Sequence, residues 1–233
     1  MKLLLTSNGL SNDSIAKALA DLIGKEPKSS RVAFIPTAAN PERGNKDWLI
    51  DDLYCIKDRG YYVDIVELTA LKPPEIKKIL KDVDAIFVGG GNTFYLSYWM
   101  QKTELFELLP ELLKTKVYAG ISAGSIITGA NLKTASDALA NIEKFEDKDY
   151  DLLGPPSESS SKTLQFVDFV FRPHLNSSFF PEITEEKLRE KAKHFAHRFY
   201  ALDDNSALKV VDGKVEPISE GEWLVFNEQA GNT

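Results

Sequence analysis

One serine of this chain lies in a pattern that activates serine hydroxyls. Residues 117–129 read VYAGISAGSIITG, so a short apolar run enters a Gly-Ile-Ser-Ala-Gly turn and a helix-compatible segment follows. In this order of strand, turn and helix, the pattern G-x-S-x-G forms a nucleophile elbow. The small residues Gly120 and Gly124 allow the sharp bend that leaves Ser122 accessible. The alternative is a glycine-rich turn whose serine only caps the helix.

A serine nucleophile needs a general base, and the chain offers three histidines. His174 follows an apolar β run and a proline in FVFRPHLNSS, and loops at the carboxyl ends of strands carry the sites of open α/β sheets. His194 and His197 are spaced i, i+3 in KAKHFAHRF, on a stretch that reads as a charged helix. No third ligand has a suitable spacing, so a solvated helix face is favoured over a metal pair. We therefore predict that His174 is the base and that no metal is bound.

The residues alone do not choose the carboxylate that would orient this histidine. The candidates between the serine and the histidine are Asp137, Asp147, Asp149 and Asp151, and chain order cannot choose among them. The order Ser, Asp, His would match that of the α/β-hydrolases, although triads occur in several orders on unrelated folds.

An oxyanion hole needs two N–H donors near the nucleophile. The amide of Ala123, directly after the serine, is the expected first donor. A Gly89-Gly90-Gly91 triplet ahead of a helical segment suits the second, because a glycine-rich turn at a helix N-terminus presents backbone N–H groups. Phosphate binding is the rival interpretation of the triplet. The segment lacks both the G-K-[ST] of a P-loop and the spacing of G-x-G-x-x-G.

Composition places the chain among ordinary globular proteins. Its 233 residues are 43% hydrophobic and 27% charged, with a net charge of −7 that argues against a nucleic-acid partner. The apolar runs are as long as strands rather than membrane spans, and MKLLLTSNGL reads as a buried first strand rather than a signal peptide. A single cysteine, Cys55, excludes an internal disulfide framework. We expect one domain over residues 1–233, in the cytoplasm and without a membrane partner.

The first half alternates strand-like and helix-like segments, which predicts a parallel, doubly wound α/β sheet with helices on both faces. Strands are expected at Lys2–Thr6, Arg31–Pro36, Tyr62–Leu68, Asp84–Val88 and at the run that enters the serine turn. Helices are expected at Asp13–Ile23, Asp47–Asp58, Pro74–Leu80, Asn92–Met100 and Glu104–Leu113.

The second half indicates a few antiparallel strands at one edge of the sheet. Leu164–Phe171 alternates like a half-exposed strand, and Thr184–Phe199 reads as a charged helix. Ser206–Phe226 holds three short β runs around Asp212-Gly213, a strong hairpin signal. The polar segment Lys144–Ser161 is expected to be a mobile loop.

Four segments together resemble the peptidase E family of serine peptidases, peptidase family S51, to which cyanophycinase is a more distant relative. They are GGGNTFYL (89–96), GISAGS (120–125), TASDA (134–138) and RPHLN (172–176). The resemblance covers nearly the whole chain and implies a class I glutamine amidotransferase-like fold with serine in the elbow. It implies Ser122 as nucleophile, His174 as base and Asp137 as orienting carboxylate. Gly91 and Ala123 look like the oxyanion donors.

The same resemblance guides the expectations about substrate. The branch similar to aspartyl dipeptidases carries an arginine after the catalytic histidine, suited to an N-terminal aspartyl carboxylate, whereas this chain has Thr184 at about that place. We therefore expect a serine peptidase acting on short peptides, without a cofactor and without Asp-X preference. Four residues are expected to contact the substrate: Gly90, Asn92, Arg172 and Asn176.

Two other functions stay open on the sequence. An esterase or amidase of α/β-hydrolase type would use the same elbow, but the chain is short and has no HGGG-type segment. A non-catalytic binding protein would keep the elbow as a remnant of the fold. A homodimer is compatible with any of these functions.

Overall fold

The computed structural model describes residues 1–132 and 162–228 and contains a seven-stranded sheet in the order β3-β2-β4-β5-β1-β8-β9. Neighbouring strands from β3 to β1 are parallel, whereas β8 and β9 run antiparallel to their neighbours. The bounds are β1 Lys2–Thr6, β2 Arg31–Ile35, β3 Tyr62–Ile65, β4 Ala85–Val88, β5 Val117–Ile121, β8 Ser206–Val211 and β9 Lys214–Ser219. The doubly wound α/β sheet predicted from the alternating pattern is confirmed.

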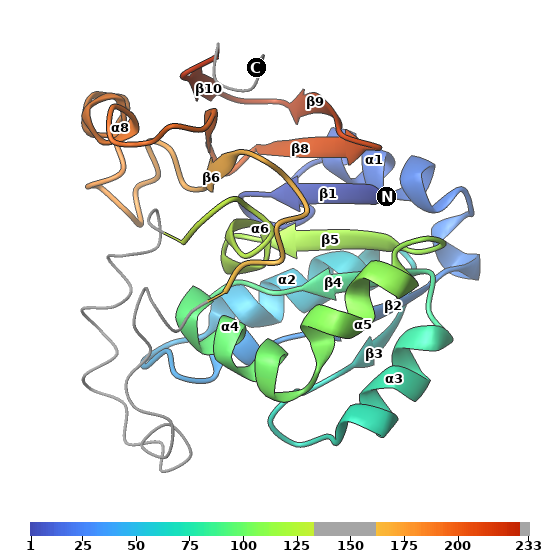
Figure 1. Ribbon diagram of the computed structural model, residues 1–233. Helices are drawn as coiled ribbons and strands as arrows, with labels where there is room; N and C mark the ends of the chain where they lie inside the picture. Colours follow the sequence, from blue (N-terminus) through green and yellow to red (C-terminus); the bar gives the residue numbers. More distant parts are fainter. Residues whose placement is uncertain (133–161, 229–233) are drawn as a thin grey trace.

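Helices cover both faces of this sheet (Figure 1). One apolar layer joins the sheet to α1 (Asp13–Ile23) and α2 (Asp47–Asp58). The layer on the other face contains α3 (Pro73–Lys81), α4 (Thr93–Lys102), α5 (Leu105–Leu112) and the short α6 (Ala123–Ile126). Single 3₁₀ turns lie at Pro27–Ser29 and Thr37–Ala39. Because both faces are covered, the central strands β4 and β5 are buried along their whole length, and their sequences are almost continuously apolar.

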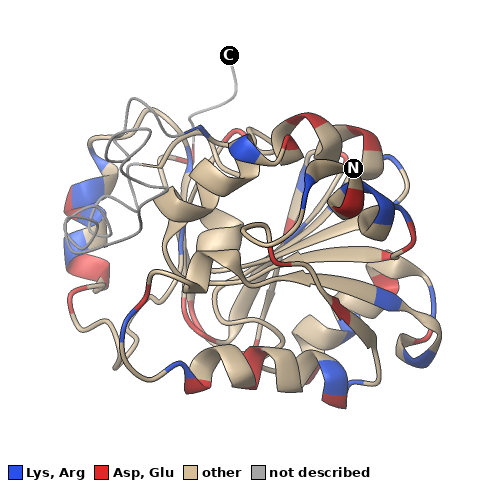
Figure 2. Ribbon diagram, turned by 90° about the horizontal axis from the view of Figure 1, so that it is seen from below, with Lys and Arg blue, Asp and Glu red and all other residues tan. Residues whose placement is uncertain are grey.

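Charged residues lie mostly on the outer helices and loops, while the strands at the centre are almost free of them (Figure 2). The antiparallel edge was also predicted. The β8–β9 hairpin turns at Asp212 and Gly213, which have φ values of 48° and 84°, as a tight hairpin turn requires.

None of the described helices is both long and apolar enough to cross a bilayer.

The remaining strands form a separate three-stranded sheet, in the order β10-β7-β6, which differs from the prediction. Its strands are β6 (Val170–Arg172), β7 (Phe199–Leu202) and β10 (Trp223–Phe226), and α8 (Glu185–Ala192) packs against it. The strand expected at Leu164–Phe171 is therefore short. The helix expected at Thr184–Phe199 ends early, because Phe199 is the first residue of the buried strand β7. The segment Lys144–Ser161 lies outside the described residues.

Candidate active site

Ser122 occupies a sharp turn between β5 and α6, with φ 46° and ψ −103°. Few residues other than glycine adopt this conformation, and it persists only where the surroundings impose it. The flanking glycines are required by close packing. A methyl group on Gly120 would lie 2.5 Å from the carbonyl oxygen of Gly124, and one on Gly124 would collide with the carbonyl of Val88. The predicted sequence of strand, turn and helix around the serine is therefore present.

Buried hydrogen bonds tie this turn to its neighbours. The N–H of Ser122 donates to the carbonyl of Thr6 at 3.1 Å, and the hydroxyl of Ser125 donates to the same oxygen at 2.8 Å. The hydroxyl of Tyr118 donates to the carbonyl of Gly124 at 2.6 Å. Each bond contributes about 1 kcal/mol, and together they fix the serine on rigid elements.

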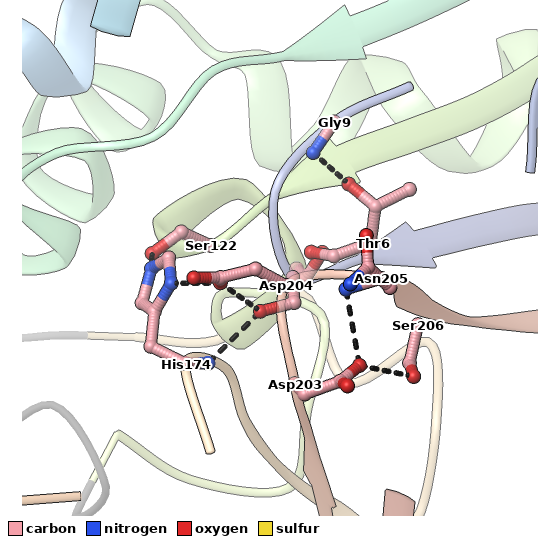
Figure 3. Close-up of polar contacts among 10 residues, drawn as sticks. Thr6, Gly9, Ser122, His174, Asp203, Asp204, Asn205 and Ser206 are labelled. Atoms are coloured by element: carbon pink, nitrogen blue, oxygen red, sulfur yellow. Dashed lines mark hydrogen bonds and ion pairs between the residues drawn. The ribbon is translucent and has the colours of Figure 1, made fainter. Parts of the chain in front are cut away.

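His174 lies directly against this serine (Figure 3). It follows β6 and Pro173, and its Nε2 is 3.0 Å from the Oγ of Ser122. The neighbouring Leu175 donates its N–H to the carbonyl of Leu202 at 2.9 Å, which anchors the histidine loop to the end of β7. The imidazole is 13% exposed and stacks on Phe180, with ring centroids 4.5 Å apart.

A carboxylate lies on the side of the imidazole that faces away from Ser122. Asp204 lies in the turn between β7 and β8, and its Oδ1 is 2.6 Å from Nδ1 of His174. Burial would raise the pKa of Asp204, but hydrogen bonds from His174, Ser177 and Ser7 and the charge of His174 outweigh it and hold this pKa below its ordinary value. The carboxylate is therefore ionised at neutral pH and accepts from Nδ1, which leaves Nε2 free to accept the serine proton.

The position of Asp204 differs from the sequence prediction. The predicted carboxylate, Asp137, lies outside the described residues, as do the three other aspartates that were considered. Asp204 follows the histidine in the sequence, whereas the aspartates from which the prediction chose all precede it. The available signal was Asp203-Asp204 directly after the apolar run FYAL, that is, a pair of acids at the end of a strand.

The glycine triplet also lies against Ser122. A methyl group on Gly90 would be 3.5 Å from the Cβ of Ser122. Gly91 has φ 124°, and a methyl group there would collide with the carbonyl of Ala38, so the loop demands glycine. Ala123 is the first residue of α6, so its N–H has no acceptor within that helix. The two predicted oxyanion donors are thus in segments that flank Ser122.

The other three residues predicted to contact the substrate are Asn92, Arg172 and Asn176. Asn92 caps α4, and its Oδ1 accepts from the N–H groups of Phe94 and Tyr95. Arg172 is buried at the end of β6, with 8% of its surface exposed. Asn176 is exposed, and its Nδ2 is 3.4 Å from a carboxylate oxygen of Glu222.

In the segment after the histidine, Thr184 stands at about the place where the branch similar to aspartyl dipeptidases carries an arginine. Thr184 is the N-cap of α8, and its Oγ1 accepts from the N–H of Lys187. Arg189 is 2.5 Å from the carboxylate of Glu185, and its guanidinium lies 5.3 Å from the centroid of the Phe226 ring. Both side chains are thus used within α8 and its packing against β10.

The other two histidines are exposed and lie beyond the end of α8 at Ala192, not on a helix as predicted. Within residues 1–132 and 162–228, no three His, Cys, Asp or Glu side chains converge in a metal-binding arrangement.

Comparisons with known proteins agree on one family. The family model described as Peptidase family S51 matches residues 3–218. The chain is 30% identical over 178 residues to Uncharacterized peptidase Lmo0363 of Listeria monocytogenes, covering 76% of this chain and 80% of that protein. It is 29% identical over 234 residues to Peptidase E of Streptomyces coelicolor, covering 96% of this chain and 80% of that protein.

Solved structures show the same architecture, a class I glutamine amidotransferase-like fold. A crystal structure provisionally described as peptidase E from Listeria monocytogenes EGD-e superposes with a TM-score of 0.70 at 25% identity, covering 94% of this chain and 98% of that one. The structure of a peptidase from an acI-B1 Actinobacterium shares the fold, with a TM-score of 0.61 at 20% identity, covering 97% of this chain and 96% of that one.

Proposed function

Because the chain belongs to peptidase family S51 and is a serine-type peptidase, we propose that it hydrolyses short peptides with Ser122, His174 and Asp204 as one catalytic unit. The observation that carries this proposal is the continuous row of contacts from Ser122 Oγ through the imidazole to the carboxylate. A serine that merely capped its helix would need neither an imidazole 3.0 Å from its hydroxyl nor a carboxylate behind that imidazole.

The first half of the reaction forms an acyl-enzyme. Oγ of Ser122 attacks the carbonyl carbon of the scissile bond, and Nε2 of His174 takes the hydroxyl proton. Asp204 keeps its charge and stabilises the imidazolium, as its lowered pKa supports. The imidazolium then gives the proton to the leaving amine as the C–N bond breaks. The second half repeats these steps with water as the nucleophile and releases the acid.

The tetrahedral intermediate carries a negative charge on the former carbonyl oxygen. We assign its stabilisation to the N–H groups of Ala123 and Gly91, on the two segments that flank the serine. Ala123 is the first residue of α6, whereas Gly91 belongs to a loop that packs closely against the carbonyl of Ala38. Backbone donors of this kind are held in place before the substrate arrives, so the reaction needs little reorganisation.

We further propose that the first residue of the substrate does not have to be acidic. An aspartyl side chain would need a charge-assisted partner in the pocket, usually an arginine. Thr184 and Arg189 have other contacts in α8, which supports a pocket without that partner.

A fluorophosphonate label tests the proposal, since only an activated serine reacts with it. The wild-type chain should become labelled at Ser122 and hydrolyse dipeptides, whereas Ser122→Ala should remain folded and do neither, with kcat lower by about 10⁴-fold or more. Labelling together with turnover of esters and not of peptides would favour the esterase. An unlabelled wild-type chain that binds peptides without cleaving them would favour the binding protein.

A further inference from the structure

Ser7 connects two members of the catalytic unit without touching the nucleophile. It follows β1 and is fully buried, with 0% of its surface exposed. The backbone N–H of His174 is 2.9 Å from its Oγ, and the same Oγ is 3.1 Å from Oδ1 of Asp204. The direction of both bonds is determined by chemistry. A backbone N–H can only donate and an ionised carboxylate can only accept, so the hydroxyl accepts from His174 and donates to Asp204.

We propose that Ser7 is a positioning residue that holds the histidine loop and the carboxylate in register, a role that rests on the function proposed above. Its hydroxyl fixes the backbone of the base and the side chain that orients the base at the same time. Ser7 directly follows β1, a strand inside the sheet between β5 and β8. Through this hydroxyl, both groups are therefore anchored to a rigid element.

The histidine needs this support because its backbone is strained. His174 has φ 66°, a left-handed conformation that residues other than glycine seldom adopt. Its N–H is directed at the Ser7 hydroxyl, and the next N–H, of Leu175, is bonded to the carbonyl of Leu202. Without the first bond, a buried donor would lack its partner and the loop could relax. The distance between Nε2 and the Ser122 hydroxyl would then no longer be maintained.

The carboxylate receives a complementary constraint. Oδ1 of Asp204 accepts from both the imidazole and Ser7, so this one oxygen is held between them. The aspartate side chain is 26% exposed and lies in a turn, so its hydrogen bonds, including one from Ser177, are what limit its rotation. Holding Oδ1 in place preserves the 2.6 Å contact to Nδ1 of His174.

A neighbouring serine provides a matched control. Ser206 is as buried as Ser7, and its carbonyl accepts from the N–H of Ser7 at 3.2 Å. Its hydroxyl, however, bonds Asp203 at 2.5 Å, and Asp203 is directed away from His174 (Figure 3). The two serines therefore each bind one carboxylate of the Asp203-Asp204 pair. Only the Ser7 contact leads to the imidazole.

The experiment compares Ser7→Ala with Ser206→Ala in dipeptide hydrolysis and fluorophosphonate labelling. Ser7→Ala should lower kcat and the labelling rate by about 10²-fold, because a misplacement of about 1 Å costs that much, while KM changes less than about 2-fold. Ser206→Ala should keep both rates within about 3-fold of wild type. Ser7→Thr, which keeps the hydroxyl, should recover most of the loss. If Ser7→Ala does not fold, Ser7→Cys replaces it, because a thiol is only a weak donor and acceptor.

A double mutant separates positioning from a general effect on the fold. In a His174→Ala background, which lacks the imidazole that both bonds of Ser7 position, Ser7→Ala should lower kcat by less than about 3-fold, since residues that act as a unit are not additive. An equally large loss in that background, or the same loss from Ser206→Ala, would overturn the role of Ser7. If Ser7→Ala is labelled by the fluorophosphonate at the wild-type rate, the role of Ser7 is also overturned, while the proposed function stays intact. Failure of the wild-type chain to be labelled at all would instead refute the proposed function.

Discussion

Asp204 and His174 are 30 positions apart in the chain, yet the carboxylate Oδ1 lies 2.6 Å from the imidazole Nδ1. Two loops from different parts of the fold meet here. One follows β6 of the small sheet, and the other leads from that sheet into β8 of the large sheet. The contact fixes which nitrogen of the imidazole carries the proton, and it therefore decides whether Nε2 can act as a base toward Ser122.

Asp204→Asn should lower kcat by about 10³- to 10⁴-fold with little change in stability. An amide can donate to Nδ1 and thereby favour the wrong tautomer of the imidazole. The matched comparison is Asp137→Asn, measured with the same dipeptide. We expect the larger loss for Asp204, and a larger loss for Asp137 would return the orienting role to the residue that the family resemblance indicates.

Removing the imidazole should be nearly as damaging as removing the nucleophile. His174→Ala should lower kcat by about 10⁴-fold, and the double mutant with Ser122→Ala should be little worse than either single mutant. His194→Ala and His197→Ala serve as controls because both side chains are exposed beyond α8, and they should retain wild-type kcat. An essential His194 or His197 together with a dispensable His174 would refute the assignment of the base.

Gly91→Ala should lower kcat, because the added methyl group collides with the carbonyl of Ala38 and must displace the loop that carries one of the two proposed oxyanion donors. A loss of about 10²-fold or more is expected for one misplaced donor. Gly213→Ala is the control. Gly213 also has a positive φ, of 84°, but its methyl group would meet nothing within 4 Å. That variant should lose stability and retain kcat, and an equal kcat loss in both would contradict the role of the Gly91 loop.

Asp-X dipeptides should be no better substrates than Ala-X or Leu-X dipeptides. The physical reason is that Thr184 and Arg189 are committed to contacts within α8, so neither offers its charge or hydroxyl freely to an acidic side chain. The measurement is kcat/KM for a set of dipeptides with varied first residue. A preference for Asp-X above about 10²-fold would demand a dedicated carboxylate partner and overturn this expectation. Arg172→Ala would then be the first variant to test, followed by Arg189→Ala.

Stability should fall as the pH rises from about 4 to about 7, through Asp52 on α2. Burial, reinforced by the charge of Asp51, raises the pKa of Asp52 to about 7. Between its unfolded pKa and this value, the folded state holds a proton that the unfolded state has lost, so ionisation favours unfolding. The penalty is absent below about pH 4 and complete above about pH 7. Asp52→Asn should therefore stabilise the protein by about 2 kcal/mol at pH 8 and have little effect at pH 4.

Thermal melts at pH 4 and pH 8 measure this effect, with the exposed Asp51→Asn as the control, expected to stay within about 0.5 kcal/mol. A stabilisation by Asp52→Asn of the same size at both pH values would show that packing, and not ionisation, is responsible.

Much of the large sheet was predictable because its signals are local. Strands such as Ala85–Val88 are almost continuously apolar, and the β8–β9 turn is marked by Asp212-Gly213. The turn at Ser122 is equally local, because Gly120 and Gly124 act on the backbone within two residues of it. Backbone conformation and burial over a few residues depend mainly on those residues themselves.

The small sheet was harder to predict because its strands are short and pair with distant segments. Phe199 was predicted to end a helix but is the first residue of β7, which lies between β6 and β10, where burial and ladder hydrogen bonds override helix propensity. Pairing of this kind is not encoded in the periodicity of one segment.

The candidate site shows the same difference between local sequence signals and long-range contacts. The sequence by itself determined that Ser122 lies in a tight elbow and that His174 follows a strand, because both properties belong to single segments. Only the tertiary structure decided that Asp204 lies against that histidine and that Ser7 binds them both. Those contacts join the end of β1, the loop after β6 and the turn before β8. The order of strands in two sheets brings these segments together, and no local pattern of residues specifies that order.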